Sequence, residues 1–262
     1  MKRVLFIGAG RMAQAIIEGL KDKNEFSIIV ANNGNEERLN VIRESYSVAT
    51  TKSWKKEVGK ADIIFLAMPP NVHESLLLEL SGEMNGQLVL TVAAGIGPSF
   101  MESMLPDGTP VAWVMPNTAA KLGQSMTMYA PGNWVTEQHI KIIETLISGI
   151  GEYERVSEQQ IIELTAVTGS APAFIYRIAE ALENIALESG VTPLQARKLV
   201  AQMIMGSAEM LKTNANPAAL ADEVATPGGS TAAGLEVLDT KGLADLMTEA
   251  IYACRERAAS LT

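Results

Sequence analysis

The stretch Lys2–Ala13, KRVLFIGAGRMA, decides the fold that we expect for this chain. Residues Val4–Ile7 form an unbroken apolar run, which is typical of a strand buried on both faces of a sheet. Gly8 and Gly10 turn the chain directly after this strand, and the pattern predicts a helix over Met12–Leu20. Strand, glycine turn and helix together give the dinucleotide-binding pattern G-x-G-x-x-G/A, whose last position is an alanine here.

The small residues of this turn fit a bound pyrophosphate. The first glycine permits a tight turn, the second lets the backbone approach the phosphates, and the alanine allows the helix to pack on the strand. Free amides and the helix dipole supply about +0.5 charge at the helix start. A turn without a ligand is the alternative, but the order of strand, turn and helix favours the nucleotide. The predicted contacts here are Gly8, Ala9, Gly10, Arg11 and Met12.

The composition limits the partners of the protein. With 262 residues the chain exceeds one typical domain of about 100 to 150 residues, which favours two domains. A net charge of -9 argues against nucleic acid and anionic membranes, because phosphate-rich surfaces need a basic patch. The single cysteine, Cys254, excludes an intramolecular disulfide and fits a reducing compartment. No apolar stretch reaches the roughly 18 residues of a membrane span, so we expect a cytoplasmic protein.

Further apolar runs predict more strands of the same sheet. They lie at Phe26–Ala31, Asp62–Met68, Leu88–Ala93 and Val111–Met115, with helix signals at Glu36–Glu44 and Lys52–Val58. Strands that alternate with helices predict an α/β domain with a Rossmann-type, doubly wound parallel sheet. In such sheets ligands bind beyond the carboxyl ends of the strands. The remaining predicted cofactor contacts follow these strands and are Asn32, Asn33, Ala67, Met68, Pro69, Ala93, Gly95, Met115 and Asn117.

The loop after the second predicted strand indicates which cofactor binds. An acidic side chain at this point would bond the ribose hydroxyls of NAD and repel the additional phosphate of NADP. The loop Asn32–Asn35 has neutral amides and a glycine instead, and Arg38 is the nearest cation. We therefore predict NADPH as the cofactor, with NADH as the alternative.

The second part of the chain is predicted to be helical. We predict a dinucleotide-binding domain over residues 1–153 and a helical domain over 154–262, with breaks at 169–172, 190–193, 214–217 and 227–229. Helices over Ala173–Ser189 and Leu194–Leu211 are unusually apolar for so small a domain. We expect a second copy of the chain to cover them, which makes the protein a homo-oligomer.

The segment Val224–Leu235, VATPGGSTAAGL, is the most specific after the N-terminus. Two glycines precede Ser230 and Thr231, which open a helix. Free amides and hydroxyls that converge at such a helix start suit a small carboxylate. The alternative is an ordinary helix cap, with Ser230 or Thr231 as the capping side chain.

Other catalytic arrangements have little support. His73 and His139 are the only histidines, and each falls on a helix that we expect to be exposed. A metal site or a histidine-based triad is therefore not predicted. The segment Gly169–Ala171 is not a nucleophile elbow, because no strand precedes it.

The order of these motifs resembles that of the pyrroline-5-carboxylate reductase family. The resemblance covers nearly the whole chain and rests on FIGAGRMA at Phe6–Ala13, VAAGI at Val92–Ile96, VMPNT at Val114–Thr118, TGSAPAF at Thr168–Phe174 and ATPGGST at Ala225–Thr231. The family implies an N-terminal dinucleotide domain and a C-terminal helical domain that interlocks with a second subunit. Such dimers often assemble further into rings of five.

The resemblance implies the reduction of 1-pyrroline-5-carboxylate to proline, the last step of proline biosynthesis, with hydride passing from a reduced nicotinamide to the imine carbon. By analogy, amides around Gly229, Ser230 and Thr231 hold the ring carboxylate. The Thr231 hydroxyl faces the imine nitrogen, which makes Thr231 the predicted catalytic residue. The predicted substrate contacts are Thr226, Gly228, Gly229, Ser230, Thr231, Asn117 and Ser170.

Several positions depart from the family pattern. Pro69 replaces a lysine, Ala171 a glycine, Trp113 an arginine and Ala119 a proline, and Trp54 lies near a frequent cofactor-contacting asparagine. These differences keep open a diverged, non-catalytic paralogue of the competence-operon type. A hydroxyacid dehydrogenase on the same two-domain plan is disfavoured, because the lysine that it needs one turn into the long helix is absent. The chain has Phe174, Tyr176 and Arg177 there.

Overall fold

The computed structural model describes residues 1–21, 23–34, 36–213 and 216–260. Asn35 of the predicted cofactor loop and residues 214–215 of a predicted helix break lie outside the described residues. The chain divides into two compact units, Met1–Gly169 and Ser170–Thr262. The first unit contains the sheet, and the described part of the second contains helices and no strand.

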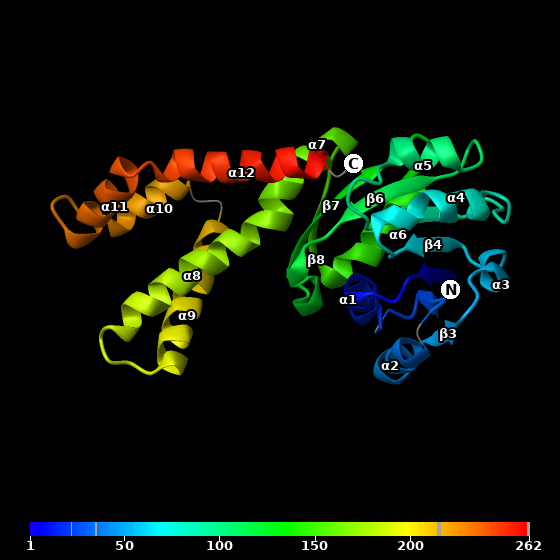
Figure 1. Ribbon diagram of the computed structural model, residues 1–262, viewed down its shortest axis with the longest axis horizontal. Helices are drawn as coiled ribbons and strands as arrows, with labels where there is room; N and C mark the ends of the chain where they lie inside the picture. The colour runs from blue at the N-terminus through cyan, green and yellow to red at the C-terminus, as the bar shows by residue number, and fades with distance from the viewer. Residues whose placement is uncertain (22, 35, 214–215, 261–262) are drawn as a thin grey trace. The chain divides into compact units, whose positions relative to one another are not determined.

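An eight-stranded sheet forms the centre of the first unit, in the order β3-β2-β1-β4-β5-β6-β7-β8 (Figure 1). Neighbouring strands pair in parallel except β6 and β7, which are antiparallel. The predicted Rossmann-type parallel sheet is therefore confirmed over β1 to β6, and the whole sheet is mostly parallel. The strands are β1 (Lys2–Ile7), β2 (Phe26–Ala31), β3 (Ala49–Thr51), β4 (Ile63–Leu66), β5 (Leu88–Thr91), β6 (Val111–Met115), β7 (Ser125–Pro131) and β8 (Gly151–Arg155).

Strands β3, β7 and β8 are absent from the prediction, and each has a physical reason. β3 has only three residues, and the helix predicted over Lys52–Val58 shrinks to Lys55–Val58 behind it. β7 buries Ser125 and Thr127, whose hydroxyls bond each other at 3.0 Å, so it does not read as an apolar run. β8 lies at one edge of the sheet and is largely exposed. Polar or short strands of this kind lack the apolar pattern of the central ones.

Helices cover both faces of the sheet (Figure 1). Val4 and Phe6 of β1 face a core that includes side chains of α1, α2 and α6, while Leu5 and Ile7 face a core that includes α3, α4 and α5. The two-sided burial of β1 is what its unbroken apolar run predicts. These helices are α1 (Arg11–Leu20), α2 (Glu36–Tyr46), α3 (Lys55–Val58), α4 (His73–Ser81), α5 (Pro98–Met104) and α6 (Glu137–Ile147), with short 3-10 turns η1 (Pro70–Val72), η2 (Thr118–Leu122) and η3 (Ser148–Ile150).

Gly8 turns the chain tightly against the neighbouring strand β4. Its φ is +107°, and a Cβ built on it would lie 2.5 Å from the carbonyl oxygen of Ala67. The Ala67 backbone is itself held, because its N–H donates to the Ile7 carbonyl at 2.8 Å. A side chain at position 8 is therefore both strained and obstructed.

We expect Gly8→Ala to lower the free energy of unfolding by about 3 kcal/mol, because it adds backbone strain to a collision with a fixed carbonyl. Urea denaturation of the purified variant measures the change. A loss below about 1 kcal/mol would mean that this turn tolerates a side chain and is looser than the structure indicates.

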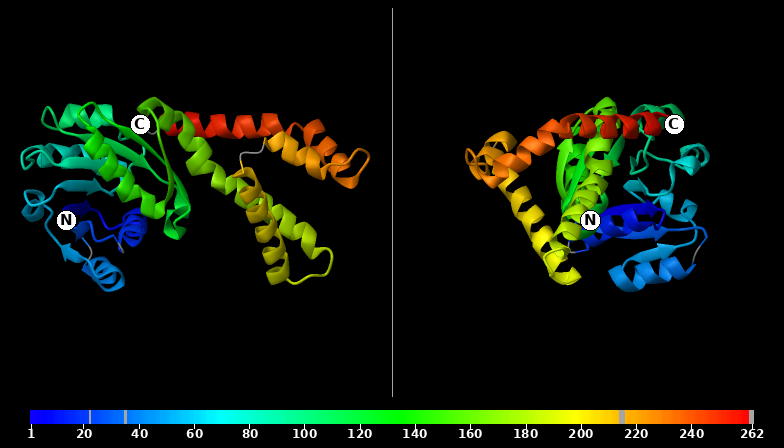
Figure 2. Two further views of the ribbon diagram at one scale, coloured as in Figure 1. Left: turned by 180° about the vertical axis from the view of Figure 1, so that it is seen from behind. Right: turned by 60° about the vertical axis from the view of Figure 1, so that its left-hand side comes forward.

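The second unit contains α8 (Ala171–Leu187), α9 (Pro193–Leu211), α10 (Pro217–Val224), α11 (Ser230–Thr240) and α12 (Leu243–Ala259). α8 and α9 lie side by side as a helical hairpin, drawn in yellow-green to yellow in Figure 2. Among the described residues, α8, α10, α11 and α12 contain no buried side chain. Large apolar side chains are exposed instead, including Ile185, Leu199 and Met205. This exposed apolar surface agrees with the expectation that a second subunit covers it.

The predicted break at 169–172 is wrong. Residues Ala166–Ser170 form a π-helical segment between α7 (Glu158–Thr165) and α8. Pro172 has no N–H to donate to the carbonyl of Thr168, four residues earlier, and this carbonyl accepts a hydrogen bond from Asn117 Nδ2 at 3.1 Å instead. Such π segments occur frequently at functional sites.

Candidate active site

The predicted cofactor loops lie at one edge of the sheet. Strands β2, β1, β4, β5 and β6 are parallel, and the register aligns Ile7 with both Ala31 and Leu66, and Leu66 with Thr91. Each predicted cofactor contact lies at or just after the carboxyl end of one of these strands, or at the start of α1. After β1 come Gly8, Ala9 and Gly10, and then Arg11 and Met12 at the start of α1; after β2 come Asn32 and Asn33; after β4 come Ala67, Met68 and Pro69; after β5 come Ala93 and Gly95; at the end of β6 are Met115 and Asn117. The structure therefore brings all of these residues to the carboxyl edge, where α/β sheets bind nucleotides.

The start of α1 fits a pyrophosphate. Gly10 is the N-cap residue, no side chain caps this helix, and its first turn contains no acidic residue that would compete with a phosphate. A Cβ built on Gly10 would meet only the carbonyl oxygen of Ala67, at 3.8 Å, so the space beside the glycine is open. Backbone amides at a helix start surrounded by open space suit a phosphate group.

The loop after β2 lies beside Lys52, which is not among the predicted cofactor contacts. The N–H of Asn32 donates to the Thr51 carbonyl at 3.2 Å, which joins this loop to the end of β3. Lys52 follows immediately, and its Nζ lies 2.8 Å from Glu36 Oε2. The hydrogen bond from Lys52 holds the pKa of Glu36 below its ordinary value. The predicted helix over Lys52–Val58 begins only at Lys55, so Lys52 follows the strand β3 and lies next to the loop after β2.

His73 is buried, which corrects the prediction of an exposed histidine. Its side chain contacts the loop after β4, where Nδ1 lies 3.1 Å from the Pro69 carbonyl. Its Nε2 lies 2.9 Å from Thr91 Oγ1, at the end of β5. His139 is half-buried on α6, and its Nδ1 accepts a hydrogen bond from the N–H of Thr136 in a capping box. The two histidines therefore belong to separate local networks.

Asn117, predicted to contact both substrate and cofactor, has both ends of its amide engaged within the chain. Its Oδ1 accepts from the N–H of Ala119 at 3.0 Å, and its Nδ2 donates to the Thr168 carbonyl at 3.1 Å. Its own N–H donates to Ser125 Oγ at 3.0 Å. These bonds join the loop after β6 to the π segment that ends at Ser170, so Asn117 organises this region through its side chain.

The start of α11 is free of capping side chains. Gly229 is the N-cap residue, and neither Ser230 nor Thr231 caps the helix, so the capping alternative is wrong. Thr226, Pro227, Gly228 and Gly229 form a turn with φ +71° at Gly228, in which the Gly229 N–H donates to the Thr226 carbonyl at 2.9 Å. Proline followed by a glycine with positive φ is the pattern of a type II turn.

The turn decides which amides are available at this helix start. The Gly229 amide is used within the turn, which corrects the expectation that it holds a carboxylate. Helix geometry leaves the next three amides, those of Ser230, Thr231 and Ala232, without intrahelical acceptors. Three free amides suit an anionic group of carboxylate size.

The two tryptophans at positions that depart from the family pattern are core residues. Trp54 is 4% exposed and packs in the core with α3 and α4. Trp113 is 2% exposed and packs with Met115 and Ile161, and its indole N–H has no hydrogen-bond partner among the described residues. Both side chains are therefore part of the hydrophobic core of the first unit.

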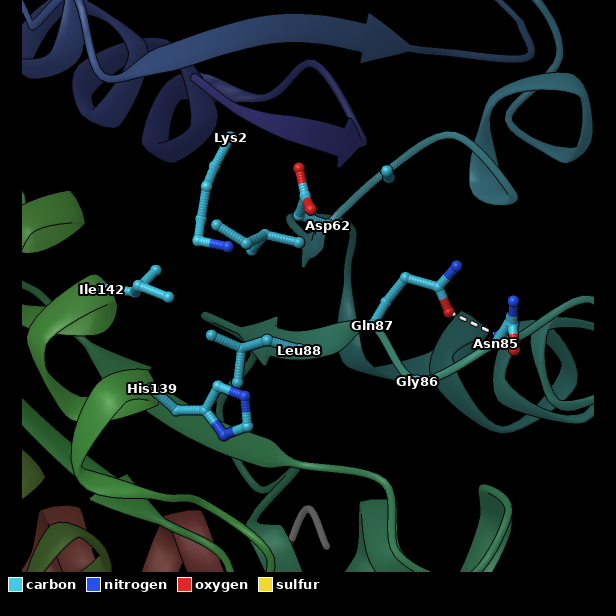
Figure 3. Close-up of a pocket in the computed structure, with 10 residues that line it drawn as sticks. Lys2, Asp62, Asn85, Gly86, Gln87, Leu88, His139 and Ile142 are labelled. Atoms are coloured by element: carbon cyan, nitrogen blue, oxygen red, sulfur yellow. Dashed lines mark hydrogen bonds between the residues drawn. The ribbon is translucent and has the colours of Figure 1, made fainter.

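A small polar pocket lies at the opposite edge of the sheet. It has a volume of about 190 Å³ and includes Lys2, Ile63 and Leu88, which are at the amino ends of β1, β4 and β5. Figure 3 shows Lys2 and His139 beside it, and the hydrogen bond of 2.7 Å from the Asn85 N–H to Gln87 Oε1. Its place at the amino ends separates it from the predicted cofactor loops.

Outside residues 22, 35, 214–215 and 261–262, no group of three or more His, Cys, Asp or Glu side chains could hold a metal ion. Over the same part of the chain, no helix has the length and apolar character needed to cross a bilayer.

Comparisons with known proteins agree with the architecture. Residues 158–261 match the family model for pyrroline-5-carboxylate reductase dimerisation, and residues 3–95 match the model described as NADP oxidoreductase, coenzyme F420-dependent. The first match covers the helices with the exposed apolar surface, and the second covers the glycine turn and strands β1 to β5.

Individual relatives match over the full length of the chain. Pyrroline-5-carboxylate reductase 1 of Bacillus subtilis is 35% identical over 266 residues, which cover 100% of this chain and 90% of the relative. The structure of a pyrroline-5-carboxylate reductase from Coxiella burnetii is 30% identical with a TM-score of 0.92, covering 100% of this chain and 98% of that chain. The Plasmodium falciparum pyrroline carboxylate reductase, crystallised with NADP bound, shares the fold at 24% identity and a TM-score of 0.86, covering 99% and 97%. The chain therefore belongs to the pyrroline-5-carboxylate reductase family.

Proposed function

We propose that this protein is an NADPH-dependent reductase that converts 1-pyrroline-5-carboxylate to proline. The observation that carries the proposal is the start of α11, where three amides follow a glycine N-cap and no side chain competes for them. An anionic ring substrate matches this arrangement, and the names of the full-length relatives support the same substrate. The glycine turn of the first unit, with open space at Gly10, fits the pyrophosphate of the cofactor.

The chain's own residues position the substrate. In our proposal the amides of Ser230, Thr231 and Ala232 bind the ring carboxylate, and the Thr231 hydroxyl orients the imine nitrogen. Bound NADPH would supply the hydride that reduces the imine carbon. A protonated imine is already a good hydride acceptor, so positioning contributes most of the rate and the site needs no strong acid. Solvent supplies the proton to the nitrogen.

Steady-state absorbance tests the proposal. We expect the purified protein to oxidise NADPH only when 1-pyrroline-5-carboxylate is present. Calorimetric titration with NADPH serves as the control. If the protein binds NADPH but does not oxidise it in the presence of the substrate, the proposal is contradicted and the protein is a non-catalytic paralogue.

The cations beside the β2 loop favour NADPH over NADH. Lys52 follows β3, and Arg38 is exposed on α2, so either can approach a phosphate on the adenosine ribose. The neutral side chains of Asn32 and Asn33 leave room for that phosphate.

We expect Lys52→Ala and Arg38→Ala each to raise KM for NADPH about fivefold, because each removes a charged partner of the phosphate, while KM for NADH changes less than about twofold. Initial rates with each cofactor measure the split. Lys56→Ala, at an exposed position on α3, is the matched control and should change neither value. Equal effects on NADH and NADPH would contradict the assigned phosphate site.

The proposed enzyme is a homodimer formed through its helical unit. The exposed apolar side chains of α8 to α12 and the match of residues 158–261 to a dimerisation model support this assembly. We propose that dimers assemble further into rings of five and that the enzyme acts in the cytoplasm, where reducing conditions suit its single cysteine. Light scattering of the purified protein measures the number of copies.

A further inference from the structure

His73 and Thr91 form a buried hydrogen-bond network that the proposed reaction does not use. Both residues are 0% exposed. The Pro69 carbonyl can only accept, so His73 Nδ1 carries the proton and donates across 3.1 Å. His73 Nε2 is then an acceptor for the Thr91 hydroxyl at 2.9 Å, and Thr91 Oγ1 in turn accepts the Ala93 N–H at 3.1 Å. Every donor in this chain of bonds has a matching acceptor.

The surroundings of His73 keep this arrangement intact. Burial lowers the pKa of His73, so the imidazole is neutral at neutral pH and retains one donor and one acceptor nitrogen. A second proton on Nε2 would face the hydroxyl of Thr91 and remove its acceptor. A neutral histidine with a fixed tautomer is therefore a rigid link between its two partners.

The ends of the network lie on two neighbouring loops. Pro69 follows β4 and Ala93 follows β5, and the backbone ladder between these strands ends near the Val92 N–H bond to the Leu66 carbonyl at 3.2 Å. Pro69 and Ala93 lie beyond the ends of the two strands, and the network through His73 and Thr91 connects them there. Both loops belong to the predicted cofactor edge.

We infer that His73 and Thr91 are positioning residues that hold the loops after β4 and β5 at the spacing needed to bind the nicotinamide cofactor. Loops that are ordered before binding lose less conformational entropy when the ligand arrives, which strengthens binding. The inference rests on the proposed function, because it takes Pro69 and Ala93 as cofactor contacts. Neither His73 nor Thr91 needs to touch the cofactor or the reacting atoms for this role.

Thr91→Val and Thr91→Ser form a matched pair that tests the inference. Valine keeps the shape of threonine but removes the hydroxyl, whereas serine keeps the hydroxyl and removes a methyl group. We expect Thr91→Val to raise the NADPH Kd about fivefold to tenfold, because valine removes both hydrogen bonds of the Thr91 hydroxyl, to His73 and from the Ala93 N–H, and so leaves the two loops unconnected before NADPH binds. We expect Thr91→Ser, which keeps the hydroxyl, to raise the Kd less than about twofold. At saturating NADPH, kcat of the valine variant should stay within about twofold of wild type, because bound cofactor orders the loops.

His73→Leu and the double variant with Thr91→Val make the test independent of either single substitution. If both residues act through one network, the NADPH Kd of the double variant should match that of the weaker-binding single variant. Multiplication of the two single effects, or equal Kd values for Thr91→Val and Thr91→Ser, would overturn the inference. Wild-type protein is titrated with NADPH and assayed in parallel. If the wild type failed to bind NADPH, both the proposed function and the inference would be overturned. If the wild type is active, the variants test the inference alone.

Discussion

A Gly10→Val variant should fold as stably as the wild type and bind NADPH about a hundredfold more weakly, a difference of about 2.7 kcal/mol. The backbone at Gly10 has φ -74° and ψ 176°, which valine adopts without strain. A Cβ there meets only one protein atom within 4 Å, the Ala67 carbonyl oxygen at 3.8 Å. The added side chain therefore occupies the space that a pyrophosphate needs.

Substitutions at Gly8 and Gly10, in the same turn, should have different effects: the first lowers the stability of the fold, and the second weakens NADPH binding. Alanine at position 8 collides with backbone that belongs to the fold, whereas valine at position 10 enters open space. Thermal unfolding and calorimetric titration with NADPH measure the two effects. Gly59→Val is the matched control, since Gly59 is exposed, has a negative φ and has nothing within 4 Å of its built Cβ. Unchanged NADPH affinity in Gly10→Val would contradict the proposed nucleotide site.

The second large effect is expected at Thr231. We expect Thr231→Ala to lower kcat about tenfold to a hundredfold, because the imine nitrogen loses the hydroxyl that orients it. Stability should change by less than about 1 kcal/mol, since the Thr231 hydroxyl does not cap α11. The KM for NADPH should stay near the wild-type value, because the glycine turn is untouched.

Two further variants distinguish the effect of the Thr231 hydroxyl from the effect of any substitution in α11. Thr231→Ser keeps the hydroxyl and should recover most of the turnover, while Thr240→Ala, at the other end of α11, should have no effect on kcat. Steady-state rates at saturating NADPH with varied 1-pyrroline-5-carboxylate provide the measurement. A Thr231→Ala enzyme with wild-type kcat would remove Thr231 from the mechanism.

The central strands and the glycine turn could be predicted because burial on both faces leaves a local mark on the sequence. β1, β4, β5 and β6 read as apolar runs, and the carboxyl edge follows from their parallel order. β7 escaped prediction because it buries two polar residues, and the Thr127 hydroxyl donates to Ser125 Oγ inside the sheet. This hydrogen bond forms only in the folded sheet, so the pattern of apolar residues in the sequence does not indicate it.

The finer structure of the site depends on contacts distant in sequence. The pairing of His73 with Thr91 spans 18 positions and that of Asn117 with Thr168 spans 51, so local patterns could not indicate either. Pro172 was a possible indication of the pair Asn117 and Thr168, because proline has no N–H to donate to the Thr168 carbonyl. The TPGG segment likewise contained the type II turn that removes the Gly229 amide from the proposed carboxylate site.

Transfer of a labelled hydride tests the central claim most directly. The protein is incubated with 1-pyrroline-5-carboxylate and NADPH that contains deuterium at the transferred position of the nicotinamide, and the product is analysed by mass spectrometry and NMR. We predict proline with one deuterium on the former imine carbon, formed at the rate at which NADPH is consumed. Proline that is absent, or that contains no deuterium on this carbon, would contradict the account.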